Sequence, residues 1–303
     1  MPDYFDHNFQ PYRSHIDAAQ YSLSIKSALG LLENFRKSSP AAFPNEHKGS
    51  PFYVMGYAAF ASHDYPTASL LFDAAVAEDI RRFGPTADKP ALLFIRLEDK
   101  DQEVLASQII REIITSVEEL INDYNPRRGA KQITIDELRT HFIKPILSSP
   151  DDHKRTLITA FISFIAEWKY RARLIDIIER GSREPFFLHI YRGCLLFESL
   201  VKEKLTAPLP TNRNTLGSAL QQMYHQLQIP ANLSLQCSDF DAEVSSLTAA
   251  MPVVDAVQMT GKVRNTLGHD LAWPSTSLNQ ATYNLTVKNI AAACIHAISM
   301  LYR

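Results

Sequence analysis

The chain has 303 residues, of which 46% are hydrophobic and 21% are charged, and this ordinary globular composition excludes intrinsic disorder as the state of the whole chain. A formal net charge of −2 argues against a protein that coats nucleic acid through its overall charge, but it leaves a local basic site open. Glycines number only ten, and neither G-x-x-x-x-G-K-[ST] nor G-x-G-x-x-G occurs, so a glycine-loop nucleotide site is disfavoured.

The cysteines and the apolar segments indicate where the protein works. Cys194, Cys237 and Cys294 are odd in number and contain no C-x-x-C pair, so we expect neither a disulfide framework nor a zinc site. The first residues lack the basic and apolar stretches of a signal peptide. The most apolar stretch, 157–168, is interrupted by polar residues and is too short to span a bilayer. The sequence therefore predicts a cytoplasmic protein that does not contact a membrane.

Helical periodicity dominates the first half of the chain. Apolar residues recur at helical spacing over 16–35 and 109–121, and Thr134 to Glu137 has the pattern of a capping box that opens a helix through Ile146. Only 91–97 (ALLFIRL) could form a strand, and a buried helical segment fits it as well. We expect an all-α protein.

One segment of the first half has the spacing of a helical hairpin. Small and large apolar residues alternate there at helix-contact positions: Phe52, Met55, Gly56, Ala59, Ala68, Phe72 and Ala75. Asp64 and Tyr65 are expected to make the turn. This pattern resembles one tetratricopeptide repeat, although Ile80 stands where that repeat usually has proline. A generic helical hairpin is the alternative interpretation.

A further amphipathic helix is predicted to begin at Ser149, with Pro150 in its first turn, and to end near Gly181. Its apolar stripe consists of Leu157, Phe161, Phe164, Trp168, Ile175 and Ile178. The polar segment 179–185 (ERGSREP) is then expected to join two domains, a tetratricopeptide-like region over 1–180 and a helical bundle over 181–303. Four helices are predicted in the bundle, over 186–205, 215–227, 239–268 and 279–302.

The motif with the clearest chemical meaning is GKVRNTLGHD, which contains Arg264, Asn265 and His269. On an ideal helix Asn265 and His269 share a face, whereas Arg264 lies about 140° from His269. One chain therefore does not aim both groups at one phosphate unless Gly268 distorts the last turn. Two chains related by a two-fold axis could pool their motifs, so we expect a homodimer through the C-terminal bundle.

An arginine–polar–xxx–histidine motif late in a small helical bundle resembles the HEPN superfamily of ribonucleases. Arg264, Asn265 and His269 match its three polar positions, and the upstream helix with Tyr191, Glu198 and Lys202 resembles the first helix of that family less specifically. The resemblance covers 181–303 and implies a ribonuclease, a toxin or an enzyme of antiviral defence. A tetratricopeptide-like region joined to such a domain is a known pairing in bacterial defence systems.

The residue types of the motif suit RNA cleavage without a metal or cofactor. Histidine can take the proton of the 2′-hydroxyl or give one to the leaving oxygen, arginine can hold the phosphate, and asparagine adds a neutral donor. Lys202, Lys204 and Lys262 are expected to contact the substrate backbone. The alternative is that His269 only caps its helix, in which case the chain is a non-catalytic scaffold or sensor that binds a protein partner, a nucleotide or RNA.

Other charged groups favour structural roles. Asp151, Asp152 and His153 could form half of a metal site, but helix capping explains the two acids. A loop with Arg127, Arg128 and Lys131 is more typical of a plain surface loop than of an RNA contact. Likewise, an ordinary surface position is the favoured interpretation of Lys169, Arg171 and Arg173, rather than a contact to RNA or lipid.

Overall fold

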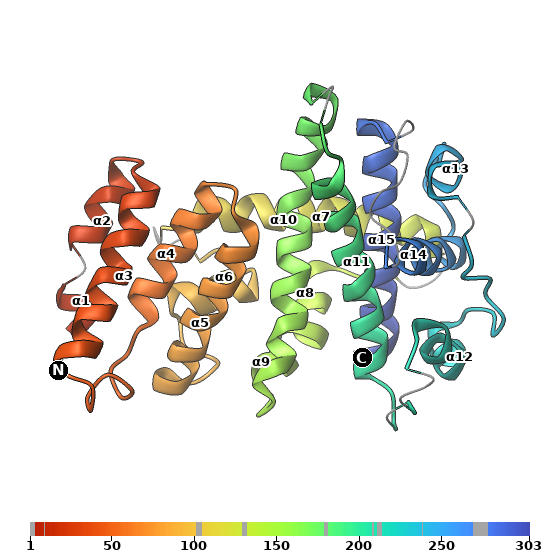
Figure 1. Ribbon diagram of the computed structural model, residues 1–303. Coiled ribbons are helices and arrows are strands. Elements are labelled where there is room, and N and C mark those ends of the chain that lie inside the picture. The colour runs from red at the N-terminus through yellow and green to blue at the C-terminus, as the bar shows by residue number, and fades with distance from the viewer. Residues whose placement is uncertain are drawn as a thin grey trace. The chain divides into compact units, whose positions relative to one another are not determined.

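The computed structural model describes residues 4–8, 10–100, 105–128, 132–178, 181–207, 209–210, 214–237, 239–268 and 278–303. Regular structure in these ranges is entirely helical, which confirms the all-α fold class for this part of the chain (Figure 1). Residues 91–96 of the ambiguous segment lie in helix α6 (Pro90–Arg96), where they are buried, and Leu97 caps the end of this helix. The buried-helix interpretation of this segment is therefore correct, and the strand interpretation is wrong.

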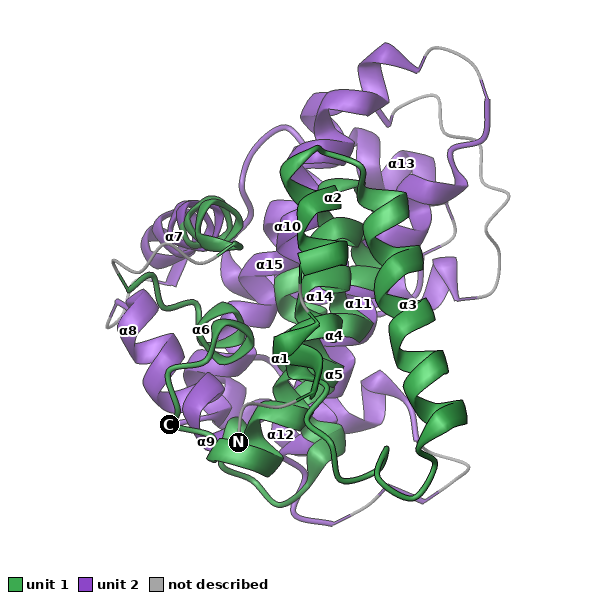
Figure 2. Ribbon diagram, turned by 90° about the vertical axis from the view of Figure 1, so that its left-hand side faces the viewer, with its two compact units in different colours: residues 1–114, 146–163 green, residues 115–145, 164–303 purple. Residues whose placement is uncertain are grey.

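Two compact units divide the chain, one formed by residues 1–114 and 146–163 and the other by residues 115–145 and 164–303 (Figure 2). The residues of two long helices, α7 (Ser107–Arg128) and α10 (Arg155–Ile177), are shared out between the units. The compact units and the predicted domains, 1–180 and 181–303, thus divide the chain at different places, and the domain assignment stays a prediction.

The first unit begins with helices α1 (Tyr4–His7), α2 (Gln10–Asp17) and α3 (Tyr21–Ser38). The single helix expected over 16–35 is therefore broken. Ala19 has φ 55°, a left-handed conformation that ends α2, and the amide of Gln20 returns to the carbonyl of His15 at 2.7 Å. Apolar spacing continues across this turn, so periodicity alone did not reveal it.

The helical hairpin is present as α4 (Gly49–Ala61) and α5 (Tyr65–Phe83). Asp64 caps α5 by accepting from the amide of Thr67 at 3.3 Å. The helices approach closely at Gly56, where a Cβ atom would lie 3.0 Å from the ring of Phe72. Phe72 is buried against the stacked ring of Phe94, with ring centroids 4.0 Å apart. The hairpin prediction is confirmed, whereas the tetratricopeptide resemblance remains a proposal.

Several predicted helix starts are found in place, and one is displaced. The capping box of Thr134 and Glu137 opens α8 (Ile135–Leu138), which continues through a π-helical turn (Arg139–Ile143) into α9 (Lys144–Leu147). The helix expected from Ser149 begins later, with a 3-10 turn at Asp152–Lys154 ahead of α10. The hydroxyl of Ser149 accepts from the amide of Asp151 at 3.2 Å and so closes the preceding turn instead.

The second unit includes α11 (Glu184–Glu203), α12 (Leu216–Leu227), α13 (Phe240–Ser245), α14 (Val253–Leu267) and α15 (Gln280–Leu301). Helices α11, α14 and α15 pack against one another (Figure 1). At Gly193 a Cβ atom would lie 2.5 Å from Phe164 and 2.8 Å from Ile290, so this crossing requires glycine. The long helix expected over 239–268 is two helices, since α13 ends at Ser245 and α14 begins after Pro252.

Candidate functional site

Arg264 of α14 is held by a carboxylate of α11. Its Nε atom donates to Oε2 of Glu198 at 2.5 Å, and Nζ of Lys202, one turn further along α11, lies 2.5 Å from the other oxygen. The Glu198 side chain is only 5% exposed, whereas those of Arg264 and Lys202 are 26% and 25% exposed. Two cations thus share one buried carboxylate, and the cluster carries one net positive charge.

The guanidinium of Arg264 keeps capacity for a ligand. Within the part of the chain that the structure describes, its Nε atom has the hydrogen bond to Glu198 and its two terminal nitrogens have none. A guanidinium fixed at one nitrogen presents the other edge in a defined orientation, and this edge matches two oxygens of a phosphate or carboxylate.

Tyr191 extends this face of α11 toward the end of α14. Tyr191, Glu198 and Lys202 follow at spacings of seven and four residues and therefore share one face of the helix. A Cβ atom at Gly268 would lie 3.4 Å from the Tyr191 hydroxyl, so the phenol lies beside the last residue before position 269. The structure therefore gathers Tyr191, Glu198, Lys202 and Arg264 from two helices. His269 itself lies outside the described residues.

Asn265 points to a different neighbour. Its Nδ2 atom donates to the carbonyl oxygen of Leu235 at 3.0 Å, in the irregular segment that precedes α13. Sequence reasoning missed this partner because Leu235 belongs to no helix and lies thirty residues away. In this conformation the amide of Asn265 secures a segment of its own chain.

The three lysines expected to bind substrate have separate surroundings. Lys202 joins Arg264 through Glu198 and also donates to the carbonyl of Asn214 at 3.1 Å. Nζ of Lys204 lies 4.1 Å from the ring centroid of Tyr302. Lys262 is bound by both carboxylate oxygens of Glu243, at 3.0 and 3.1 Å. Lys202 therefore lies in the same cluster as Arg264 and Glu198, while Lys204 and Lys262 contact other side chains.

The basic loop expected at Arg127 and Arg128 is instead the last turn of α7. Nη1 of Arg127 donates to Oδ1 of Asn289 at 2.6 Å and to the carbonyl of Met251 at 3.3 Å. Arg128 donates to Ser299 at 3.2 Å. The loop assignment was wrong, because both arginines tie the end of α7 to the bundle. Lys131 lies outside the described residues.

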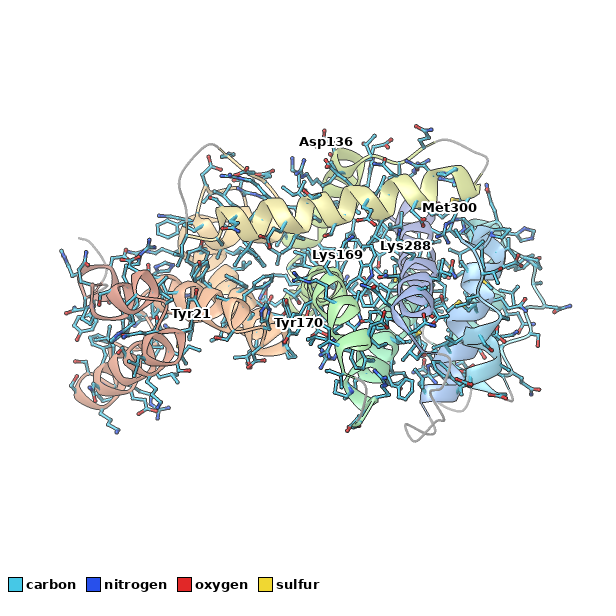
Figure 3. All side chains as sticks on the ribbon, turned by 90° about the horizontal axis from the view of Figure 1, so that it is seen from above. Tyr21, Asp136, Lys169, Tyr170, Lys288 and Met300 are labelled. Atoms are coloured by element: carbon cyan, nitrogen blue, oxygen red, sulfur yellow. The ribbon has the colours of Figure 1, made fainter. Side chains whose placement is uncertain are left out.

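The other charged clusters serve internal ion pairs. Asp151 pairs with Lys154 at 2.9 Å and Asp152 with Arg155 at 2.5 Å. Glu119 of α7 is reached by Lys169 of α10 and Lys288 of α15, two of the side chains labelled in Figure 3. Among the described residues no group of three or more histidine, cysteine, aspartate or glutamate side chains could hold a metal ion. None of the described helices combines the length and the apolarity needed to cross a membrane.

Comparison of the chain with models of protein families, with curated proteins and with solved structures finds no match.

Proposed function

We propose that the bundle at the C-terminal end of this chain is a metal-independent endoribonuclease that cleaves single-stranded RNA and acts as a toxin or in antiviral defence. The observation that carries the proposal is the contact between Arg264 and Glu198, with Lys202 on the same carboxylate. The residues that carry the HEPN resemblance come from two separate stretches of sequence. Residues of one active site must lie close together, and Arg264, Glu198 and Lys202 do.

The role of Arg264 follows from its surroundings. Glu198 removes the rotational freedom of the guanidinium, and the terminal nitrogens then offer two parallel donors to the phosphate that is attacked. As negative charge grows on the phosphate oxygens, this fixed positive group stabilises the transition state more than the ground state. Glu198 acts through Arg264 and is a positioning residue.

His269 supplies the proton transfer in this proposal. RNA carries its own nucleophile, so the reaction begins when a base removes the proton of the 2′-hydroxyl. The O2′–P bond forms, the P–O5′ bond breaks, and the 5′-oxygen takes up a proton. The products are a 2′,3′-cyclic phosphate and a 5′-hydroxyl, and no redox partner is needed. In a two-fold dimer, one chain can supply the base and the other chain the acid, because their motifs lie at the same site.

The arginine is tested by a series of variants assayed on single-stranded RNA in EDTA. We expect Arg264→Ala to lose about 100- to 1,000-fold in cleavage rate, the cost of removing a group that stabilises the developing charge. Arg264→Lys should recover part of that loss, because a point charge lacks the bidentate edge. Asn265→Ala should leave some activity, because it removes an orienting hydrogen bond and not a proton carrier. Equal rates for the wild type and Arg264→Ala would overturn the proposed role.

A further inference from the structure

We infer that residues 230–237 form an autoinhibitory strap that competes with RNA for Asn265. This inference rests on the proposed function and concerns regulation of the same site. The strap connects α12 to α13 and runs past α14, where the carbonyl of Leu235 accepts from Nδ2 of Asn265.

Leu235 holds the strap against the helices beside it. From Asn232 to Cys237 the side chains alternate between exposed and half-buried, with Leu233, Leu235 and Cys237 half-buried. Leu235 fits between two glycines: a Cβ atom at Gly261 would lie 2.6 Å from its Cδ2 atom, and one at Gly217 would lie 3.5 Å from its Cδ1 atom. The slot on α14 therefore exists because position 261 has no side chain.

Releasing the strap from α14 should require little free energy. Among the described residues, the backbone of 230–237 makes no hydrogen bond to other backbone groups, and the bond from Asn265 joins it to α14. Segments with few backbone bonds and partly exposed side chains open at a small fraction of the global unfolding free energy. A ligand that binds Asn265 can therefore displace the strap without unfolding α12 or α14.

Competition follows from the chemistry of one amide. Asn265 adjoins Arg264, and the amide nitrogen that would orient a phosphate is the one that Leu235 occupies. RNA binding through Asn265 must break that bond, so the seated strap lowers the affinity for RNA. Unseating the strap should raise the affinity about fivefold, which is the worth of one net hydrogen bond.

A matched pair of glycine variants tests the strap. Gly261→Ala places a methyl group on the Leu235 seat and expels a flexible side chain, while alanine strengthens α14. Gly217→Ala makes the same change on the opposite wall at an ordinary contact distance and serves as control. Both are compared with the wild type by limited proteolysis within 230–237 and by binding of a 2′-O-methyl RNA oligonucleotide, which cannot be cleaved.

We expect faster proteolysis within 230–237 and about fivefold tighter RNA binding for Gly261→Ala, with wild-type behaviour for Gly217→Ala. Unchanged proteolysis in Gly261→Ala would overturn the seating, whether or not the protein cleaves RNA. Faster proteolysis with unaltered binding would overturn the competition and leave the ribonuclease proposal intact. Faster proteolysis in a protein that neither binds nor cleaves RNA would overturn both.

Discussion

At the scale of single residues, one carboxylate decides the geometry of the candidate site. Glu198 is buried and satisfies both Arg264 and Lys202. The sequence shows the i, i+4 spacing of Glu198 and Lys202, and it also shows the motif that contains Arg264. The partner of Asn265 was not predicted from the sequence, because Leu235 lies in an irregular segment. The path of this segment depends on packing against two glycines, and no local sequence pattern indicates it.

Removing the Glu198 carboxylate should cost stability and leave two cations without their shared partner. We expect Glu198→Ala to lower the free energy of unfolding by roughly 3 kcal/mol, and Glu198→Gln by less, since glutamine keeps an acceptor. Urea unfolding measures both. The double variant Glu198→Ala/Arg264→Ala should be less destabilised than the sum of the two single changes, and strict additivity would show that the pair is not coupled.

Two buried histidines should make the protein sensitive to acid. His189 donates through Nε2 to the carbonyl of Phe164 and accepts at Nδ1 from the Tyr283 hydroxyl, and His296 repeats this arrangement with Leu227 and Tyr124. Because a carbonyl can only accept, Nε2 of each ring carries a hydrogen, and the neutral ring leaves Nδ1 to accept from the tyrosine hydroxyl. Burial lowers the pKa of each histidine from 6.5 to about 4.

The sign of the pH effect follows from these pKa values. As the pH falls from 6.5 to 4 the unfolded chain takes up protons that the folded chain refuses, so the free energy of unfolding declines. The loss should reach roughly 2–3 kcal/mol for each histidine. His296→Gln should flatten this dependence, and His225→Gln, at an exposed histidine, should not. Equal slopes in the two variants would contradict the assignment.

At the scale of elements, the predicted capping box of Thr134 and Glu137 opens α8 as expected, whereas the helix predicted from Ser149 begins later. Helices α12 and α15 begin directly after Thr215 and Asn279, whose side chains accept from backbone amides. Periodicity alone joined α2 to α3 and α13 to α14. The first break is a tight turn at Ala19, whereas residues 246–252 separate α13 from α14.

Two glycines in helices should respond oppositely to alanine. Gly56→Ala places a methyl group against the Phe72 ring, which Phe94 prevents from moving away, so we expect a loss of roughly 1–3 kcal/mol. A Cβ atom at Gly30 in α3 meets nothing within 4 Å, so Gly30→Ala should gain about 0.5–1 kcal/mol of stability. Thermal unfolding distinguishes the two, and a stabilising Gly56→Ala would refute the tight contact.

At the scale of the whole molecule, the proposed reaction needs two copies of the bundle. We expect sedimentation equilibrium to give twice the chain mass at micromolar concentration, and the specific RNA-cleaving activity to fall on dilution into the monomer range, because two chains supply the groups that act on one phosphate. A monomer with full activity at every dilution would exclude the pooled site.

The central claim is that His269 moves the proton of a ribose hydroxyl without a metal, and one assay addresses it directly. Purified wild-type chain and His269→Ala are incubated in EDTA with a single-stranded RNA and with the DNA of the same sequence, and the ends of the products are identified. We predict that the wild type cuts only the RNA and leaves 2′,3′-cyclic phosphate ends, because DNA lacks the attacking hydroxyl. His269→Ala should leave the RNA intact while keeping the unfolding midpoint of the wild type. Cleavage by His269→Ala at the wild-type rate, or cleavage of the DNA, would contradict the mechanism.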